Sequence, residues 1–153
     1  MGNTDLTDLE DLYQQVILDH SRSPRNSRRL DRPTGFCEGY NPVCGDRVEV
    51  FVRTEKRGTI TDAAFTGSGC AICTASASMM TEALKGRNRA DAEKLVERFL
   101  AMLTGSDPDE QSLDKLIVFQ GVHRFPIRIK CATLPWHALK SALRGNSDSV
   151  ATE

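Results

Sequence analysis

The chain changes its hydrophobic period at a glycine-rich segment, residues 67–69, and this change limits the folds available to it. Before that segment, residues 47–53 alternate between apolar and polar side chains, and residues 59–66 form a second strand-like run after a turn. After it, apolar residues recur mainly at helical spacing. Strands gathered early and helices gathered late predict an α+β architecture, and a length of 153 residues fits one domain.

Local signals place the helices. Thr7 and Glu10 form a possible capping box for a first helix that ends near Pro24. Further helices are expected over Ala71–Lys85, from Asn88 to about Thr104, over Leu113–Phe119, and from Pro126 onward, with Pro135 either kinking the last helix or beginning a new one.

Two stretches resist assignment. Residues 21–45 read as a long connection rich in Arg, Pro and Gly, and connections of this length are often functional. A third strand is expected either before or around Gly39–Val43 or from a bend in the Phe65 segment. We place the domain at residues 1–144 and expect 145–153 to be a flexible C-terminal tail.

Charge and hydropathy exclude several functional classes. The net charge of −1 gives no overall attraction to nucleic acid or to a membrane surface. No apolar run approaches the ~20 residues needed to cross a bilayer. The acidic start lacks the features of a signal peptide, so we expect a cytoplasmic protein with reduced thiols. The arginines between Arg22 and Arg32 are either a solvated loop or a docking patch for an acidic partner.

The cysteines need a chemical explanation, because a reducing compartment disfavours disulfides and five is an odd number. Three of them lie where a thiolate is favoured or well placed. Cys44 is separated from Asp46 only by a glycine, Cys70 follows the glycine-rich segment at a helix start, and Cys131 follows the basic residues Arg128 and Lys130. Three thiols and one carboxylate match a four-ligand site, and thiolates select zinc, copper(I) or iron–sulfur clusters. The predicted ligands are Cys44, Asp46, Cys70 and Cys131.

The remaining candidates have weaker support. Cys70 and Cys73 form a C-x-x-C pair, so a redox function is an alternative, although the βαβ context of such proteins is missing. Cys73 is otherwise a small helix residue near the site, and Cys37 is a spare thiol. His123 is a candidate to contact the site from outside the ligand set.

Several motifs together resemble the SufU branch of the NifU/IscU/SufU family of iron–sulfur cluster assembly proteins, over about residues 8–143. The matching stretches are 12–20 with 24–26, Asn41–Asp46, Gly67–Cys70 with 75–80, and Phe125–Leu134 with Trp136. The resemblance implies a small antiparallel three-stranded sheet with helices packed on one face. It also implies the same four ligands at one exposed end of the fold.

Details of the sequence separate the branches. The IscU branch has a histidine just before its last cysteine, whereas this chain has Lys130. The 60 residues between Cys70 and Cys131 resemble the SufU insertion, here around Thr104–Asp114. Residues 125–128 depart from the IscU motif read by an Hsp70-type chaperone. Cys73 departs from the SufU pattern, where a serine is usual.

The resemblance implies an accessory protein of the sulfurtransferase kind rather than a stand-alone enzyme. It would use Zn²⁺ and accept persulfide sulfur from a PLP-dependent cysteine desulfurase, then pass it to a downstream assembly scaffold or apo-protein. We expect Cys44 to be the acceptor, because its glycine-flanked loop can move. Two alternatives use the same ligands: a scaffold for iron or a [2Fe–2S] cluster, and a zinc-stabilised module that only activates the desulfurase.

Overall fold

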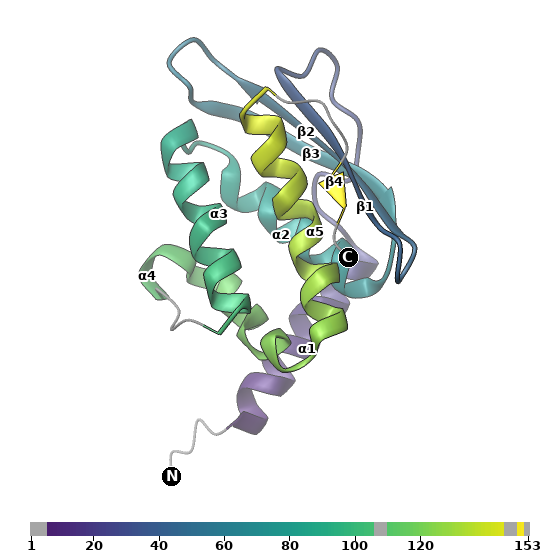
Figure 1. Ribbon diagram of the computed structural model, residues 1–153. Helices are drawn as coiled ribbons and strands as arrows, with labels where there is room; N and C mark the ends of the chain where they lie inside the picture. The colour runs from purple at the N-terminus through teal and green to yellow at the C-terminus, as the bar shows by residue number, and fades with distance from the viewer. Residues whose placement is uncertain (1–5, 106–109, 146–149, 152–153) are drawn as a thin grey trace.

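Strands β1 (Gly35–Asn41), β2 (Asp46–Thr54) and β3 (Ile60–Ser68) form an antiparallel sheet with helices on one side, as expected (Figure 1). The structure is a computed structural model that describes residues 6–105, 110–145 and 150–151, with side chains from Gln14 to Gly105 and from Gln111 to Gly145. The predicted α+β architecture is confirmed.

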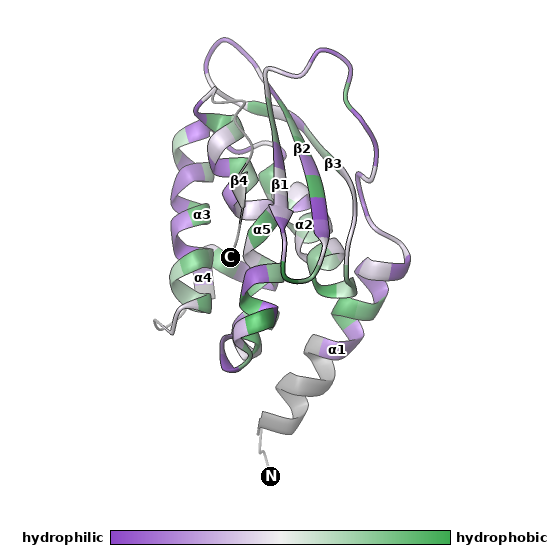
Figure 2. Ribbon diagram, turned by 45° about the vertical axis from the view of Figure 1, so that its right-hand side comes forward, coloured by the Kyte–Doolittle hydropathy of each residue, from purple (hydrophilic) through white to green (hydrophobic). Residues whose placement is uncertain are grey.

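The alternating pattern of β2 gives the sheet its two faces (Figure 2). Its inward valines pack with residues of β3 in the main core, which holds Val48, Val50, Val52, Ala63 and Phe65. The outward side chains Phe51 and Ala64 pack instead against Leu30, from the connection that precedes β1. Helices therefore cover one face of the sheet, and this connection covers part of the other.

The helices follow the predicted order, with changes at their ends: α1 (Leu6–Arg22), α2 (Ala71–Leu84), α3 (Arg89–Leu103), α4 (Glu110–Leu113), the 3-10 helix η1 (Asp114–Arg124) and α5 (Pro126–Leu143). Asn88 caps α3 as predicted, because its side chain accepts the Asp91 N–H at 2.8 Å. The helix expected at 113–119 begins earlier and continues as 3-10 turns. The side chains of Thr7 and Glu10 lie outside the described part of the chain.

The last helix runs through Pro135 without ending there. Pro126 occupies its first turn, where a missing N–H costs nothing. Trp136 stacks on Phe99 of α3 with 4.2 Å between ring centroids. Its indole N–H donates to Ser76 Oγ at 3.0 Å, and that hydroxyl donates to the Ala132 carbonyl at 2.6 Å. These buried contacts fix α5 against α2 and α3.

Strand β1 corrects the prediction of an unbroken connection over residues 21–45. Its buried positions are Gly35, Cys37, Gly39 and Asn41, while larger side chains such as Phe36 alternate with them. Close packing explains the glycines: a Cβ on Gly35 would lie 2.3 Å from the Ala142 carbonyl oxygen of α5. The strand therefore has small residues where apolar ones are expected, and it overlaps the first position proposed for the third strand.

A short fourth strand, β4 (Val150–Ala151), pairs in parallel with Gly39 and Tyr40 of β1. The order across the sheet is β3-β2-β1-β4. This pairing was not expected in a segment predicted to be a flexible tail. The domain boundary at residue 144 stays a prediction, since residues 146–149 and 152–153 are outside the described part of the chain.

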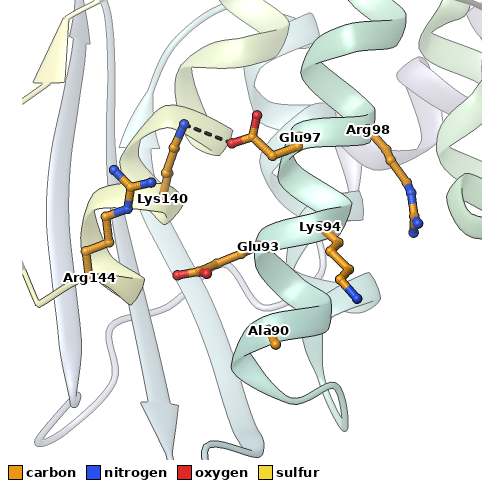
Figure 3. Close-up of a pocket in the computed structure, with 7 residues that line it drawn as sticks. All are labelled: Ala90, Glu93, Lys94, Glu97, Arg98, Lys140 and Arg144. Atoms are coloured by element: carbon orange, nitrogen blue, oxygen red, sulfur yellow. Dashed lines mark ion pairs between the residues drawn. The ribbon is translucent and has the colours of Figure 1, made fainter.

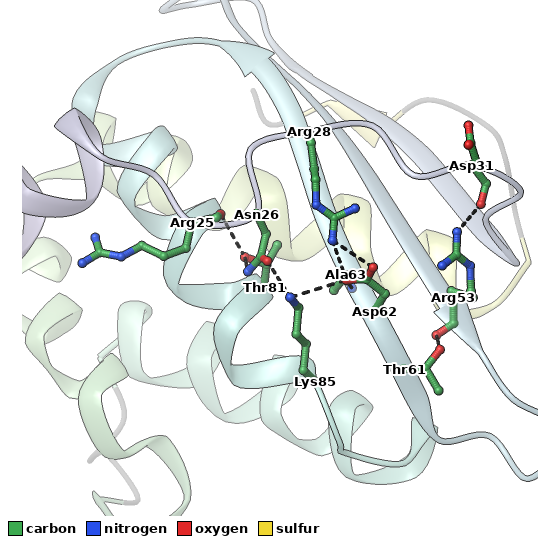
Figure 4. Close-up of polar contacts among 10 residues, drawn as sticks. All are labelled: Arg25, Asn26, Arg28, Asp31, Arg53, Thr61, Asp62, Ala63, Thr81 and Lys85. Carbon is green, nitrogen blue, oxygen red and sulfur yellow. Dashed lines mark hydrogen bonds and ion pairs between the residues drawn. The ribbon is translucent and has the colours of Figure 1, made fainter.

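The arginine-rich connection is fastened to the sheet and to α2 (Figure 4). Asn26 accepts the Phe65 N–H of β3 at 3.0 Å through its backbone carbonyl. Arg28 pairs with Asp62 at 2.9 Å, and Lys85 lies 3.5 Å from the same carboxylate. Among the arginines considered as a docking patch, Arg28 therefore has a structural partner. No helix within the described ranges has the length and apolar character needed to cross a membrane.

Candidate metal centre

The turn between β1 and β2 carries the first predicted ligand. Asn41 shapes this turn: its backbone carbonyl accepts the Gly45 N–H at 2.8 Å and its Oδ1 accepts the Val43 N–H at 3.1 Å. Gly45 has a φ of 74°, a left-handed conformation that suits glycine. The turn leaves Cys44 exposed at its tip. The predicted acceptor is therefore within reach of a partner protein.

Asp46 begins β2 immediately after the turn, and only 1% of it is exposed. Its Oδ1 accepts the backbone N–H of Cys70 at 2.9 Å, while Cys70 Sγ lies 3.8 Å from Oδ2. Cys70 is the N-cap of α2, and its sulfur accepts the Cys73 N–H at 3.4 Å. Gly69 permits this approach, because a Cβ there would lie 2.9 Å from Asp46 Oδ1. The carboxylate thus joins the hairpin to the start of α2.

Cys131 lies in α5 and is 3% exposed. Its Sγ lies 3.6 Å from Cys44 Sγ, and Asn41 Nδ2 lies 3.9 Å from it. Asn41 is fully buried and was not predicted as part of the site. The available signal was its place before Pro42, because asparagine at such a position bonds to the turn that follows. Asn41 therefore links the loop that holds Cys44 to the helix that holds Cys131.

The structure brings the predicted donor set together, with Cys70 at its edge. Donor atoms of Cys44, Asp46 and Cys131 lie within 4.8 Å of one another. Cys70 does not belong to that mutually close group of described residues, but it contacts Asp46 directly. Zn–S and Zn–O distances in tetrahedral sites place neighbouring donors roughly 3.5–3.8 Å apart. The observed 3.6 Å and 3.8 Å separations therefore fit a thiolate-rich ion site without refolding.

The metal-free thiols differ in acidity. The hydrogen bond with Cys131 is the main cause that lowers the pKa of Cys70 to about 7, and the N–H of Cys73 lowers it further. The same hydrogen bond, followed by burial, raises the pKa of the Cys131 thiol. Burial likewise raises the pKa of Cys73. At neutral pH the metal-free site therefore holds Cys70 partly as thiolate, with Cys131 as a protonated donor.

The other residues considered from sequence lie in separate surroundings. Cys37 is fully buried in β1 and Cys73 is buried in α2. His123 is exposed, with its Nδ1 3.2 Å from the Gln120 carbonyl oxygen. Arg128, one of the basic residues before Cys131, lies over the Phe125 ring, with its Cζ 4.5 Å from the ring centroid. These placements leave the four-residue set as the centre of the candidate site.

A hollow of about 460 Å³ lies elsewhere, between α3 and the end of α5 (Figure 3). Glu97 faces it and pairs with Lys140 at 2.9 Å. Glu93 and Arg144 also line it, so its charges are mixed. Its lining residues include no cysteine or histidine, and we assign the sulfur or metal chemistry to the cysteine cluster instead.

Comparison with known proteins agrees with the geometry. Residues 12–144 match the family described as NifU-like N terminal domain. The zinc-dependent sulfurtransferase SufU of Bacillus subtilis (strain 168) is 41% identical over 136 residues, which cover 88% of this chain and 91% of that protein. The iron–sulfur cluster assembly scaffold protein IscU of Streptococcus pyogenes serotype M1 is 39% identical over 145 residues, or 94% and 90% of the two chains.

A solved structure shows the same arrangement of elements. FiSufU, described as a candidate iron–sulfur cluster assembly scaffold protein for the SUF system of Fervidobacterium islandicum AW-1, superposes with a TM-score of 0.82. Its sequence is 32% identical, and the match covers 88% of this chain and 98% of that one.

Proposed function

The chain belongs to the NifU-like N-terminal domain family of iron–sulfur cluster assembly proteins of the SufU/IscU type. We propose that its specific task is to accept persulfide sulfur from a PLP-dependent cysteine desulfurase and to carry it onward in a zinc-dependent way. The name of the 41% identical relative supports both the zinc dependence and the sulfur transfer. A downstream scaffold or apo-protein in the cytoplasm then receives the sulfur.

The observation that carries this proposal is the contrast in exposure within the donor set. Cys44 is exposed on a turn and Cys70 is exposed at the start of α2, whereas Asp46 and Cys131 are 1% and 3% exposed. A partner protein can therefore reach Cys44 while the buried donors keep their positions. Cys44, Asp46, Cys70 and Cys131 would hold the zinc ion. When bound, zinc keeps thiols deprotonated at neutral pH and reduces their nucleophilicity.

The transfer itself is a sulfur exchange at Cys44. Its thiolate attacks the outer sulfur of the desulfurase persulfide, so that a new Cys44 S–S bond forms. The S–S bond on the desulfurase breaks, and the desulfurase cysteine leaves as a thiolate. Asp46 is not a nucleophile for sulfur; it holds the start of α2 in place through the Cys70 N–H.

Persulfide mapping tests the proposal. The protein is mixed with desulfurase and limiting cysteine, alkylated and cut with trypsin, which separates the thiols into peptides 30–47, 58–85 and 131–140. Shortly after mixing, before sulfur can move on, we expect extra sulfur on Cys44 of the wild type and none on the Cys44→Ala variant. Cys37→Ala, which removes a buried thiol from the same peptide, serves as the control and should load normally. Full loading of Cys44→Ala would overturn the assignment of the acceptor.

A cluster scaffold on the same residues is the second candidate, favoured by the 39% identical relative named as an IscU scaffold. In that case iron and sulfide are the cargo, and the thiolate-rich donor set suits them as well as zinc. Anaerobic reconstitution distinguishes the two. A stable [2Fe–2S] cluster that moves intact to an apo-ferredoxin would favour the scaffold function.

A further inference from the structure

Cys73 is a thiol beside the site that the proposed ligand set does not use. It lies three residues after Cys70, and its backbone N–H donates to Cys70 Sγ at 3.4 Å. The side chain is buried, at 3% exposure. The residue is held close to Cys70 by the start of α2, so any reaction between the two sulfurs needs little movement of the backbone.

The positions of the two cysteines permit a disulfide. Side chains three residues apart at a helix start have Cβ atoms roughly 5–6 Å apart. A disulfide requires about 3.5–4.5 Å between Cβ atoms, a difference that a small shift at the N-cap can supply. Cys70 is exposed and non-helical at that N-cap, with φ −69° and ψ 166°. It can therefore receive sulfur from outside and then react with the thiol behind it.

We propose that Cys73 supplies two electrons that release transferred sulfur from Cys70 as sulfide. This inference rests on the proposed function, which brings the sulfur to the site as a persulfide. The sulfur in a cluster is sulfide, so persulfide sulfur must be reduced by two electrons before it can be built in. A dithiol at the receiving site meets that requirement within one chain.

The reaction has two balanced steps. First, the Cys70 thiolate attacks the outer sulfur of the Cys44 persulfide; the Cys70 S–S bond forms, and Cys44 leaves as a thiolate. Second, the Cys73 sulfur attacks Cys70 Sγ, so that the Cys70–Cys73 disulfide forms and the bond to the outer sulfur breaks. That sulfur leaves as HS⁻ with the proton of the Cys73 thiol. The two cysteines are oxidised and the transferred sulfur is reduced, and a dithiol reductant then restores the pair.

Cys131 is the competing thiol, because its Sγ lies 3.6 Å from Cys44 Sγ. Cys131 belongs to the closest donor group, together with Cys44 and Asp46, and would help to hold the ion. Cys73 is not in the proposed ligand set, and its N–H contacts Cys70 Sγ, the atom that would carry the transferred sulfur. The two routes leave different products, since one joins Cys70 to Cys73 within a single tryptic peptide and the other joins Cys44 to Cys131 between two peptides.

The test follows sulfide and peptide mass together. Wild-type protein, Cys73→Ser and the control Cys37→Ser are loaded with desulfurase and limiting cysteine without added reductant. Released sulfide is measured, and the mass of alkylated peptide 58–85 is determined by mass spectrometry. We expect the wild type and the control to release one sulfide for each loss of two hydrogens from peptide 58–85. Cys73→Ser should release at least about tenfold less and keep an extra sulfur on Cys70 until dithiothreitol is added.

Each other outcome has a distinct meaning. A stable persulfide on the wild-type protein without sulfide release would overturn this inference and leave the proposed function intact. Sulfide release accompanied by a link between peptides 30–47 and 131–140 would overturn it in favour of Cys131. If no variant carried extra sulfur on any peptide and none released sulfide, both proposals would be removed. If Cys73→Ser folds poorly, the wild type alone tests the inference, because the amount of Cys70–Cys73 disulfide must then equal the amount of released sulfide.

Discussion

Asp46 Oδ1 accepts the backbone N–H of Cys70 at 2.9 Å, so a carboxylate at the start of β2 is also bonded to the start of α2. The two residues are 24 positions apart in the chain, and both belong to the predicted ligand set. A helix N-terminus stabilises a neighbouring negative charge. The carboxylate therefore has a structural role as well as a place among the donors, and substitutions can separate the two.

We expect Asp46→Asn and Asp46→Ala to differ in stability but not in metal binding. Both remove the charge, so both should bind zinc at least about tenfold more weakly. Asparagine retains an oxygen for the Cys70 N–H, whereas alanine leaves that donor unpaired and should lower the free energy of unfolding by about 1–3 kcal/mol. Urea unfolding of the zinc-free variants and competition with a chelator measure the two effects. Equal stability of the two variants would show that the hydrogen bond contributes little.

Gly69→Ala tests the same contact from the other side. A Cβ at this position would lie 2.9 Å from Asp46 Oδ1, so the carboxylate or the helix start must move. We expect weaker zinc binding and a free energy of unfolding lower by about 1–3 kcal/mol. Gly121→Ala is the matched control, because nothing lies within 4 Å of a Cβ there. The prediction fails if both variants bind zinc as the wild type does.

The lowered pKa of Cys70 predicts the pH dependence of its alkylation in the zinc-free protein. The thiolate is the reactive form, and a pKa of about 7 means that half of Cys70 is thiolate near neutral pH. The rate should be nearly constant well above pH 7 and fall about tenfold per pH unit well below it. Iodoacetamide labelling of peptide 58–85, resolved by mass spectrometry, gives the midpoint. Cys131→Ala removes the main hydrogen-bond partner and should raise the midpoint; an unchanged midpoint would contradict that cause.

Much of the site could be predicted from residue chemistry, because the sequence neighbours of Cys44, Asp46, Cys70 and Cys131 each indicate a possible metal ligand. A glycine between two donors, a helix start and two basic residues just before a cysteine are all visible in one sequence. Their convergence is a property of the folded chain, and there the prediction was less complete. Cys70 contacts Asp46 but stands outside the closest group of three donors.

Strand β1 shows why the fold was harder to predict in detail. Period-two reasoning expects large apolar side chains on the inner face, but β1 places Gly35 and Gly39 there because α5 lies close to it. A strand whose inward-facing residues are small lacks the alternation of apolar and polar side chains by which a strand is predicted. Asn41 was missed for a related reason: its burial and its contact with Cys131 depend on partners about 90 residues away. Long-range packing, rather than local propensity, determines both features.

A buried histidine joins α1 to α2 on another side of the molecule. His20 is 8% exposed, and its Nδ1 lies 2.7 Å from Ser78 Oγ, which also accepts the Arg25 N–H at 2.8 Å. Burial is the main cause that lowers the pKa of His20, and the charge of Arg25 adds to it. Burial also lowers the pKa of His137 in α5. Both rings therefore favour the neutral form in the folded protein.

These two histidines predict a loss of stability in mild acid. Their pKa values are lower in the folded state than the ordinary histidine pKa of about 6.5 that the unfolded chain has, so the unfolded chain binds more protons as pH falls below about 6.5. The contribution of these two histidines to the free energy of unfolding should therefore be constant above that pH and decrease below it, by at most about 1.4 kcal/mol per pH unit for each histidine. Urea unfolding between pH 7.5 and about 5, above the range in which most carboxylates titrate, measures the slope. His20→Gln should reduce it, His137→Gln should reduce it separately, and the exposed His123→Gln should leave it unchanged. A slope that survives the double substitution His20→Gln with His137→Gln would assign the acid sensitivity to other groups.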